Sequence, residues 1–74
     1  MQRLGKVLHL SRSRSLILKT RIKASPQTVV LDSSLNQIGR VYDVFGPVAD
    51  PYVSIKPTVK APEKYVGHVL YVMN

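Results

Sequence analysis

Short apolar runs alternate with turn-forming residues along the whole chain, and none of these runs has the spacing of an amphipathic helix. The runs are rich in β-branched and aromatic residues. Pro, Gly, Asn, Asp and Ser separate them at intervals of roughly 8 to 12 residues, which is typical of β-strands. The pattern predicts six strands, at about residues 4–10, 16–22, 28–31, 38–45, 52–56 and 66–72.

Six short strands in a flat sheet would leave two edges unpaired, and closing the sheet into a barrel removes both edges. At 74 residues the chain is long enough for one domain and too short for two. We therefore expect an all-β fold: one small antiparallel β-barrel over residues 1–74, closed or nearly closed, with little or no helix. The chain has no glycine-arginine-rich tails.

Three of the predicted strands begin with the pattern apolar-Gly-basic-Val, around Gly5, Gly39 and Gly67. A glycine early in a strand marks a bend, a bulge or a close backbone approach, and these features let a small sheet curl shut. The same strands carry apolar residues on both faces. We expect Val7, Val41 and Val69 on one face and Leu8, Tyr42 and Leu70 on the other. Because a barrel has one interior, the surplus outward residues indicate a covering loop or, as we favour, a docking surface.

The polar segments between the runs predict the connections. Residues 11–15 alternate Ser and Arg and predict a hairpin loop. Residues 32–36 predict a turn in which side chains bond their own backbone, with Leu35 packed back on the sheet.

The inventory of reactive groups is small, with four acidic residues, two histidines and no cysteine. His9 and His68 lack the close partners of a metal site, so we predict no metal, no cofactor and no catalytic residue. Asp43 and Asp50 flank a glycine-proline turn and could form a carboxylate pair, but a turn role for Asp50 and a strand-end role for Asp43 are simpler. The sequence predicts a protein that is not an enzyme.

The net charge of +7 is typical of proteins that work near a polyanion, although a solvated basic surface accounts for it equally well. The N-terminus does not have the pattern of a signal peptide. No apolar stretch approaches the roughly 20 residues of a membrane-spanning helix. We expect a soluble, cytoplasmic protein.

The segment from Asp43 to Tyr52 combines rigid turn formers with aromatic residues. Gly46 and Pro47 lie between Phe45 and Tyr52, which we expect to be held near one another at the two ends of the turn. Such a rigid surface suits a protein interface. It is equally consistent with a tight loop whose aromatic rings close the end of the barrel, and the residues alone leave both interpretations open.

In this segment and in the flanking strands, the chain resembles the archaeal Gar proteins, the small accessory subunits of H/ACA ribonucleoproteins. The resemblance covers nearly the whole chain, and its most specific part is the glycine-proline block followed by PYV. The matching motifs are LGKVLH at 4–9, VLD at 30–32, IGRV at 38–41, DVFGPV at 43–48, PYV at 51–53, KP at 56–57, and Gly67 with LYV at 70–72.

The resemblance implies a six-stranded barrel that docks on the catalytic pseudouridine synthase subunit, away from the guide RNA. It implies a non-catalytic role in loading substrate RNA and releasing product during rRNA pseudouridylation and ribosome biogenesis. Contacts with guide and substrate RNA would then be indirect or transient. Carried over by motif, the candidate interface residues are Phe45, Gly46, Pro47, Val48, Pro51 and Tyr52.

The basic residues of the first hairpin are weaker candidates, for transient contact with RNA. They are Arg12, Arg14, Lys19, Arg21 and Lys23. The alternative function is an autonomous RNA-binding barrel of OB-like character, which reads bases by stacking them on aromatic side chains beside basic residues. Only five aromatic residues are present, and along the sequence they do not interleave with the basic hairpin, which counts against this alternative.

Overall fold

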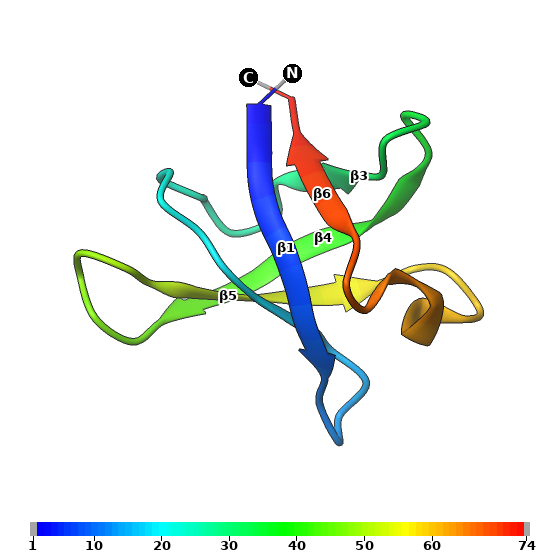
Figure 1. The fold of residues 1–74 in the computed structure, drawn as a ribbon, viewed down its shortest axis with the longest axis horizontal. Helices are drawn as coiled ribbons and strands as arrows, with labels where there is room; N and C mark the ends of the chain where they lie inside the picture. Colours follow the sequence, from blue (N-terminus) through cyan, green and yellow to red (C-terminus); the bar gives the residue numbers. More distant parts are fainter. Residues whose placement is uncertain (1, 74) are drawn as a thin grey trace.

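The computed structural model describes residues 2–73 and confirms the predicted all-β fold as a closed barrel of six strands (Figure 1). The strands are β1 (Gln2–Leu10), β2 (Leu16–Lys19), β3 (Val29–Leu31), β4 (Gln37–Phe45), β5 (Tyr52–Pro57) and β6 (Val69–Val72). One short 3-10 helix, η1 (Pro62–Tyr65), lies in the connection from β5 to β6. In residues 2–73, no helix has the length and apolar character needed to cross a membrane.

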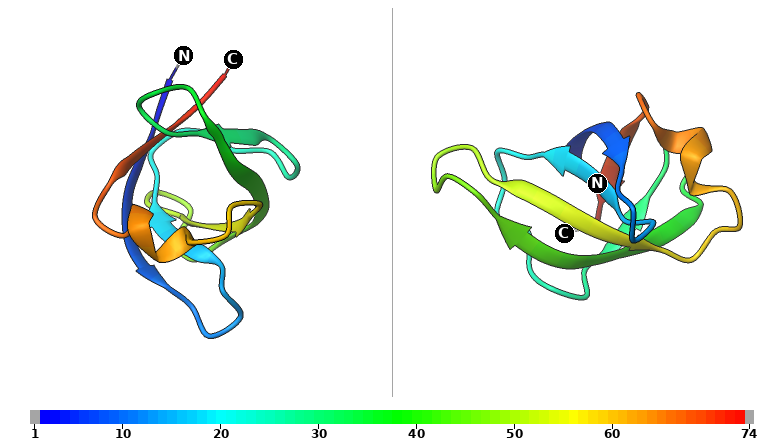
Figure 2. Two further views of the ribbon diagram at one scale, coloured as in Figure 1. Left: turned by 90° about the vertical axis from the view of Figure 1, so that its right-hand side faces the viewer. Right: turned by 90° about the horizontal axis from the view of Figure 1, so that it is seen from below.

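The strands follow the order β1-β2-β5-β4-β3-β6 around the barrel, and every neighbouring pair is antiparallel. Because β1 pairs with both β2 and β6, the sheet closes on itself (Figure 2). The pair Gln2 and Val72 brings the start of β1 beside the end of β6. Closure thus leaves none of the six strands with an unpaired edge, as expected for so small a β-domain.

The interior of the barrel is filled by aliphatic side chains from all six strands, with no aromatic residue among them. In β2, for example, Leu16 and Leu18 are fully buried, Ile17 between them is half-buried, and Lys19 is exposed. The buried core consists of Leu4, Val7, Leu16, Leu18, Val30, Ile38, Val41, Val53, Ile55, Leu70 and Val72.

Close approach of the backbone explains the glycine near the start of β1. The register with β6 shifts between Arg3 and Gly5, so a bulge lies there. A Cβ atom at Gly5 would collide with the carbonyl oxygen of Lys19 on β2. Gly39 on β4 is similarly close to the backbone of Lys56 on β5. The structure therefore confirms a bulge at Gly5 and a close backbone approach at both glycines.

The third glycine behaves differently, and two of the predicted strands are shorter than expected. Gly67 has a φ of +86° and lies in a turn before β6, so that strand begins at Val69 rather than at residue 66. Leu70 is therefore fully buried and Val69 half-buried, which reverses the predicted assignment of these two residues to the faces.

The predicted 16–22 strand ends at Lys19, because the Thr20 side chain accepts a hydrogen bond from the Ile22 amide and bends the chain.

The turn between β3 and β4 forms as predicted around a carboxylate. Asp32 Oδ1 accepts hydrogen bonds from the amides of Ser34 at 2.8 Å and Asn36 at 2.9 Å. Leu35, however, does not pack back on the sheet. It has a φ of +66° at the tip of this turn and is 60% exposed, because the Asp32 bonds hold the tip away from the barrel.

Candidate functional site

The two aromatic residues predicted to lie near one another are a directly opposed pair across β4 and β5. Phe45 is the last residue of β4, Tyr52 is the first of β5, and they are register partners. Their rings stack with centroids 5.7 Å apart and planes inclined by 19°. Phe45 remains 44% exposed and Tyr52 is half-buried, so the stack lies on the outside of the barrel and does not enter its core.

The connection of residues 46–51 joins these rings through a tight turn. Gly46 has a φ of +92°, and a Cβ atom there would lie 2.9 Å from Cδ2 of the Tyr52 ring. The Asp50 amide donates to the Pro47 carbonyl at 3.2 Å, which closes the turn. Val48 at the tip is 99% exposed. All six candidate interface residues therefore belong to one protruding hairpin, seen in yellow-green in Figure 1.

The end of β2 braces this hairpin from the side. The Thr20 amide donates to the Pro51 carbonyl at 3.0 Å, and Lys19 Nζ lies 3.6 Å from Asp50 Oδ2. The same Nζ lies 5.5 Å from the centroid of the Tyr52 ring, within range of a cation–π contact. The sequence did not indicate these contacts, because Lys19 and Tyr52 are far apart along the chain and become neighbours only when β2 pairs with β5.

A shallow groove runs along one side of the hairpin. It has a volume of about 320 Å³ and separates the hairpin from the segment that connects β2 to β3. Its walls are Arg21, Ile22, Lys23, Ala24, Ser25, Pro26, Val44, Val48 and Pro51. Val44 and residues 24–26 were not among the predicted site residues, since their proximity to the hairpin depends on closure of the barrel.

Large apolar side chains are also exposed away from the hairpin. Leu8 on β1 is 49% exposed and Tyr42 on β4 is 63% exposed, and both face outward as the sequence predicted. Tyr42 lines two small hollows, one with Arg40 and Lys56 and the other with Ser13, Ser15 and Lys56. An aromatic ring therefore does lie beside the first hairpin, contrary to the expectation from its place in the sequence.

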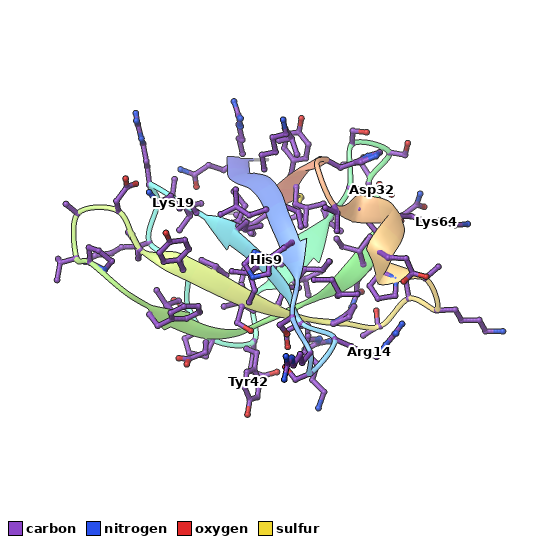
Figure 3. The ribbon with its side chains drawn as sticks, turned by 60° about the horizontal axis from the view of Figure 1, so that its bottom comes forward. His9, Arg14, Lys19, Asp32, Tyr42 and Lys64 are labelled. Atoms are coloured by element: carbon purple, nitrogen blue, oxygen red, sulfur yellow. The ribbon has the colours of Figure 1, made fainter. Side chains whose placement is uncertain are left out.

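The five basic residues attributed to the first hairpin do not form one cluster. Arg12 and Arg14 lie in the loop between β1 and β2, and Arg14 Nη2 lies 3.7 Å from Glu63 Oε2. Lys19 lies at the other end of β2, and Figure 3 shows it far from Arg14. The reason is that β2 is extended and carries the two ends of the predicted cluster apart. Lys19 and Arg21 instead join Arg3 and Lys6 around a second depression.

The carboxylates considered as a catalytic pair each have a partner of their own. Asp43 Oδ1 accepts a hydrogen bond from the Val44 amide at 2.9 Å, and Asp50 pairs with Lys19. His9 and His68 are both exposed, and the His68 ring meets Tyr65 edge-on at 6.1 Å. Within residues 2–73, no three His, Asp or Glu side chains gather as a metal site would require.

The titrating groups with shifted pKa values lie where β3 ends, on the side of the barrel opposite the hairpin (Figure 3). Partial burial raises the pKa of Asp32, but hydrogen bonds from Asn36, Ser34 and Tyr65 outweigh it and lower the pKa below its usual value. Partial burial, the nearby charge of Asp32 and the hydrogen bond that Tyr65 donates to it at 3.4 Å all raise the pKa of Tyr65. The hydrogen bonds to Asp32 stabilise the turn after β3, which is remote from the β4–β5 hairpin.

No protein-family model matches the chain. Two archaeal proteins are similar to it over nearly its whole length, and both are described only as uncharacterized. The protein from Methanothermobacter thermautotrophicus is 38% identical over 76 aligned residues, which cover 97% of this chain and 83% of the relative. The protein from Methanocaldococcus jannaschii is 35% identical over 68 residues, which cover 92% of this chain and 80% of the relative. The chain therefore belongs to the same family as these two small archaeal proteins.

Proposed function

We propose that this protein is a non-catalytic subunit of an archaeal H/ACA ribonucleoprotein. In this role it binds the catalytic pseudouridine synthase subunit through the β4–β5 hairpin. It thereby assists loading of substrate RNA and release of product during rRNA pseudouridylation, a step of ribosome biogenesis. The resemblance of its motifs to those of the Gar proteins supports the choice of partner, and the archaeal relatives agree with the proposed setting.

The observation that carries the proposal is the construction of the hairpin. The six candidate interface residues, which come from its most specific motif, form one surface on the outside of the barrel, in which Phe45 and Tyr52 stack and Val48 projects from the tip. The chemistry of this surface is aromatic rings, prolines and backbone, which suits contact with a protein. Large aromatic side chains supply much of the binding energy at protein interfaces.

Rigidity of the hairpin favours a binding role further. The contacts of Thr20 with Pro51 and of Lys19 with Asp50 hold the turn in place before any partner arrives. A surface ordered in advance loses little conformational entropy on binding, so more of its contact energy appears as affinity. Neither ring belongs to the buried core, which supports a contact surface over a cap of the barrel.

The proposal is tested by mixing the chain with the catalytic pseudouridine synthase subunit of an archaeal H/ACA particle, followed by size-exclusion chromatography and calorimetry. We expect a stable one-to-one complex. Single- and multiple-turnover pseudouridylation by the assembled particle is then measured with and without the chain. Faster multiple turnover with unchanged single turnover supports product release, and faster rates in both support loading. Failure to form a complex with the synthase subunit overturns the proposal.

A further inference from the structure

A depression of about 370 Å³ lies where the start of β1 meets the end of β2. Four cationic side chains surround it: Arg3 and Lys6 from β1, Lys19 from the end of β2, and Arg21 just beyond that strand. The remaining lining residues are Leu4, Gly5 and Ile22, so no acidic residue contributes to its wall. We call this feature the basic depression.

Within residues 2–73, most of this positive charge has no ion-pair partner. In the described part of the chain, no carboxylate oxygen lies within 4.0 Å of a nitrogen of Arg3, Lys6 or Arg21. Lys19 alone is paired, with Asp50 at 3.6 Å, and both side chains are about half exposed. Like charges gathered around one hollow repel one another, and a bound anion removes this cost.

Two strands approach each other closely at the wall of the basic depression. Gly5 lies at the bulge of β1, so close to the Lys19 carbonyl that no Cβ atom would fit between the two strands. Gly5 and the four cationic residues line the same depression. Glycine is the residue that permits close approach of a backbone to a ligand or to another chain segment.

We infer that the basic depression binds the phosphate backbone of single-stranded RNA. A guanidinium group offers a planar fork of donors that fits a phosphate, and Lys19 and Lys6 add point charges nearby. Lys19 also lies 5.5 Å from the Tyr52 ring, so one aromatic ring adjoins one of the four cations. Cations beside aromatic rings are the combination found in binding sites for single-stranded nucleic acids, and an acidic peptide would not require the rings.

This inference concerns the isolated chain and does not depend on a synthase partner. It also differs from the hairpin cluster that the sequence suggested, since Arg3 and Lys6 take the place of Arg12, Arg14 and Lys23. The antiparallel pairing of β1 with β2 creates the site, because it places the first residues of β1 beside the end of β2.

The test is fluorescence anisotropy of a labelled oligouridylate of about ten nucleotides, titrated with the full chain across a range of KCl concentrations. The site variant is Arg3→Gln/Lys6→Gln/Arg21→Gln. The matched control is Arg12→Gln/Lys60→Gln/Lys64→Gln, which removes the same charge outside the basic depression; Figure 3 shows Lys64 on the far side from Lys19. Circular dichroism and a thermal melt establish that both variants are folded.

We expect the site variant to lose about tenfold or more in affinity at low salt, with its salt-dependence slope reduced by about 2. The control should lose less than about threefold. Equal losses in both variants would mean that only net charge matters and would overturn the inference, as would undetectable RNA binding by the unmodified chain. If Tyr42→Ala lost RNA binding and the site variant did not, the RNA would bind on the outer face of β4, and the inference would be wrong. If polyglutamate bound as tightly as RNA and the site variant weakened both equally, the ligand of the basic depression would be an acidic protein and not RNA.

Discussion

Phe45 and Tyr52 stack across the β4–β5 hairpin with their ring centroids 5.7 Å apart, and Lys19 reaches the same Tyr52 ring from the end of β2. Three residues from three strands thus stabilise one exposed surface. Removal of a side chain that caps the barrel lowers folding stability, whereas removal of one that contacts a partner lowers the affinity for that partner. Measuring both quantities therefore distinguishes a barrel cap from a protein interface.

Replacement of Phe45 by alanine should weaken binding to the pseudouridine synthase subunit much more than it weakens the fold. If Phe45 is a central contact, affinity falls by about 2 kcal/mol or more, roughly 30-fold. The free energy of unfolding should change little, because Phe45 is 44% exposed and outside the core. Calorimetric titration and urea denaturation measure the two quantities.

The matched control for Phe45→Ala is Tyr42→Ala, which removes an exposed aromatic ring from the same strand but outside the segment from Phe45 to Tyr52. We expect it to leave the affinity for the synthase subunit within a fewfold of the original. Equal affinities in the original chain and in Phe45→Ala would remove Phe45 from the interface. A large loss of folding stability in Phe45→Ala would favour the cap instead.

Gly46→Ala should cost more stability than Gly67→Ala, although both glycines have positive φ values, of +92° and +86°. Each substitution forces a residue with a side chain into the left-handed region, at about 1–2 kcal/mol. Gly67 has no atom within 4 Å of the added Cβ, whereas at Gly46 this Cβ would lie 2.9 Å from the Tyr52 ring. The difference in unfolding free energy between the two variants, measured by urea denaturation, reports the contact with the ring. Equal losses of stability would mean that the Tyr52 ring moves aside at no cost.

Leu18→Ala should destabilise the barrel severely. The Leu18 side chain is fully buried on β2, and truncations of buried leucines cost about 2–5 kcal/mol. A domain of this size has little stability in reserve, so a large unfolded fraction is expected at moderate temperature. Leu8→Ala, at a position 49% exposed, should cost less than about 1 kcal/mol. Thermal melts of both variants followed by circular dichroism check the prediction, and similar melting temperatures would contradict the assignment of the core.

The turn after β3 should make the stability of the protein dependent on pH at both extremes. Hydrogen bonds outweigh burial and lower the pKa of Asp32 in the folded state, so its contribution is complete above the ordinary value of 3.8 and is lost as the pH falls below it. Burial and the charge of Asp32 raise the pKa of Tyr65, so its contribution is present below 10.0 and is lost as the pH rises through its higher folded value.

Urea denaturation at a series of pH values, with Asp32→Asn as the comparison, measures the acid part of this effect. The difference in unfolding free energy between the two proteins should be constant near neutrality and shrink below pH 3.8. A difference that stays constant down to the lowest pH would show that the Asp32 carboxylate does not titrate differently in the folded and unfolded states.

Much of the fold was predictable from the sequence because strand patterns are local. Short apolar runs separated by turn-forming residues located all six strands, and the Asp32 turn followed from side chains that bond to their own backbone. The ends of two strands were not predictable. Gly67 turns the chain and Thr20 bends it, and in both cases the same residues are also compatible with a continuing strand.

By itself, the sequence determined the run of short strands, which indicates a small β-barrel, and the tight turn that brings Phe45 and Tyr52 together, since both depend on residues near one another in the chain. Only the tertiary structure decided which distant residues join them. Pairing of β2 with β5 places Lys19 against Asp50 and Tyr52, and pairing of β1 with β2 gathers Arg3, Lys6, Lys19 and Arg21 around one depression. The physical reason is that the pairing and register of the strands set these distances, and a run of charges along the sequence does not encode them.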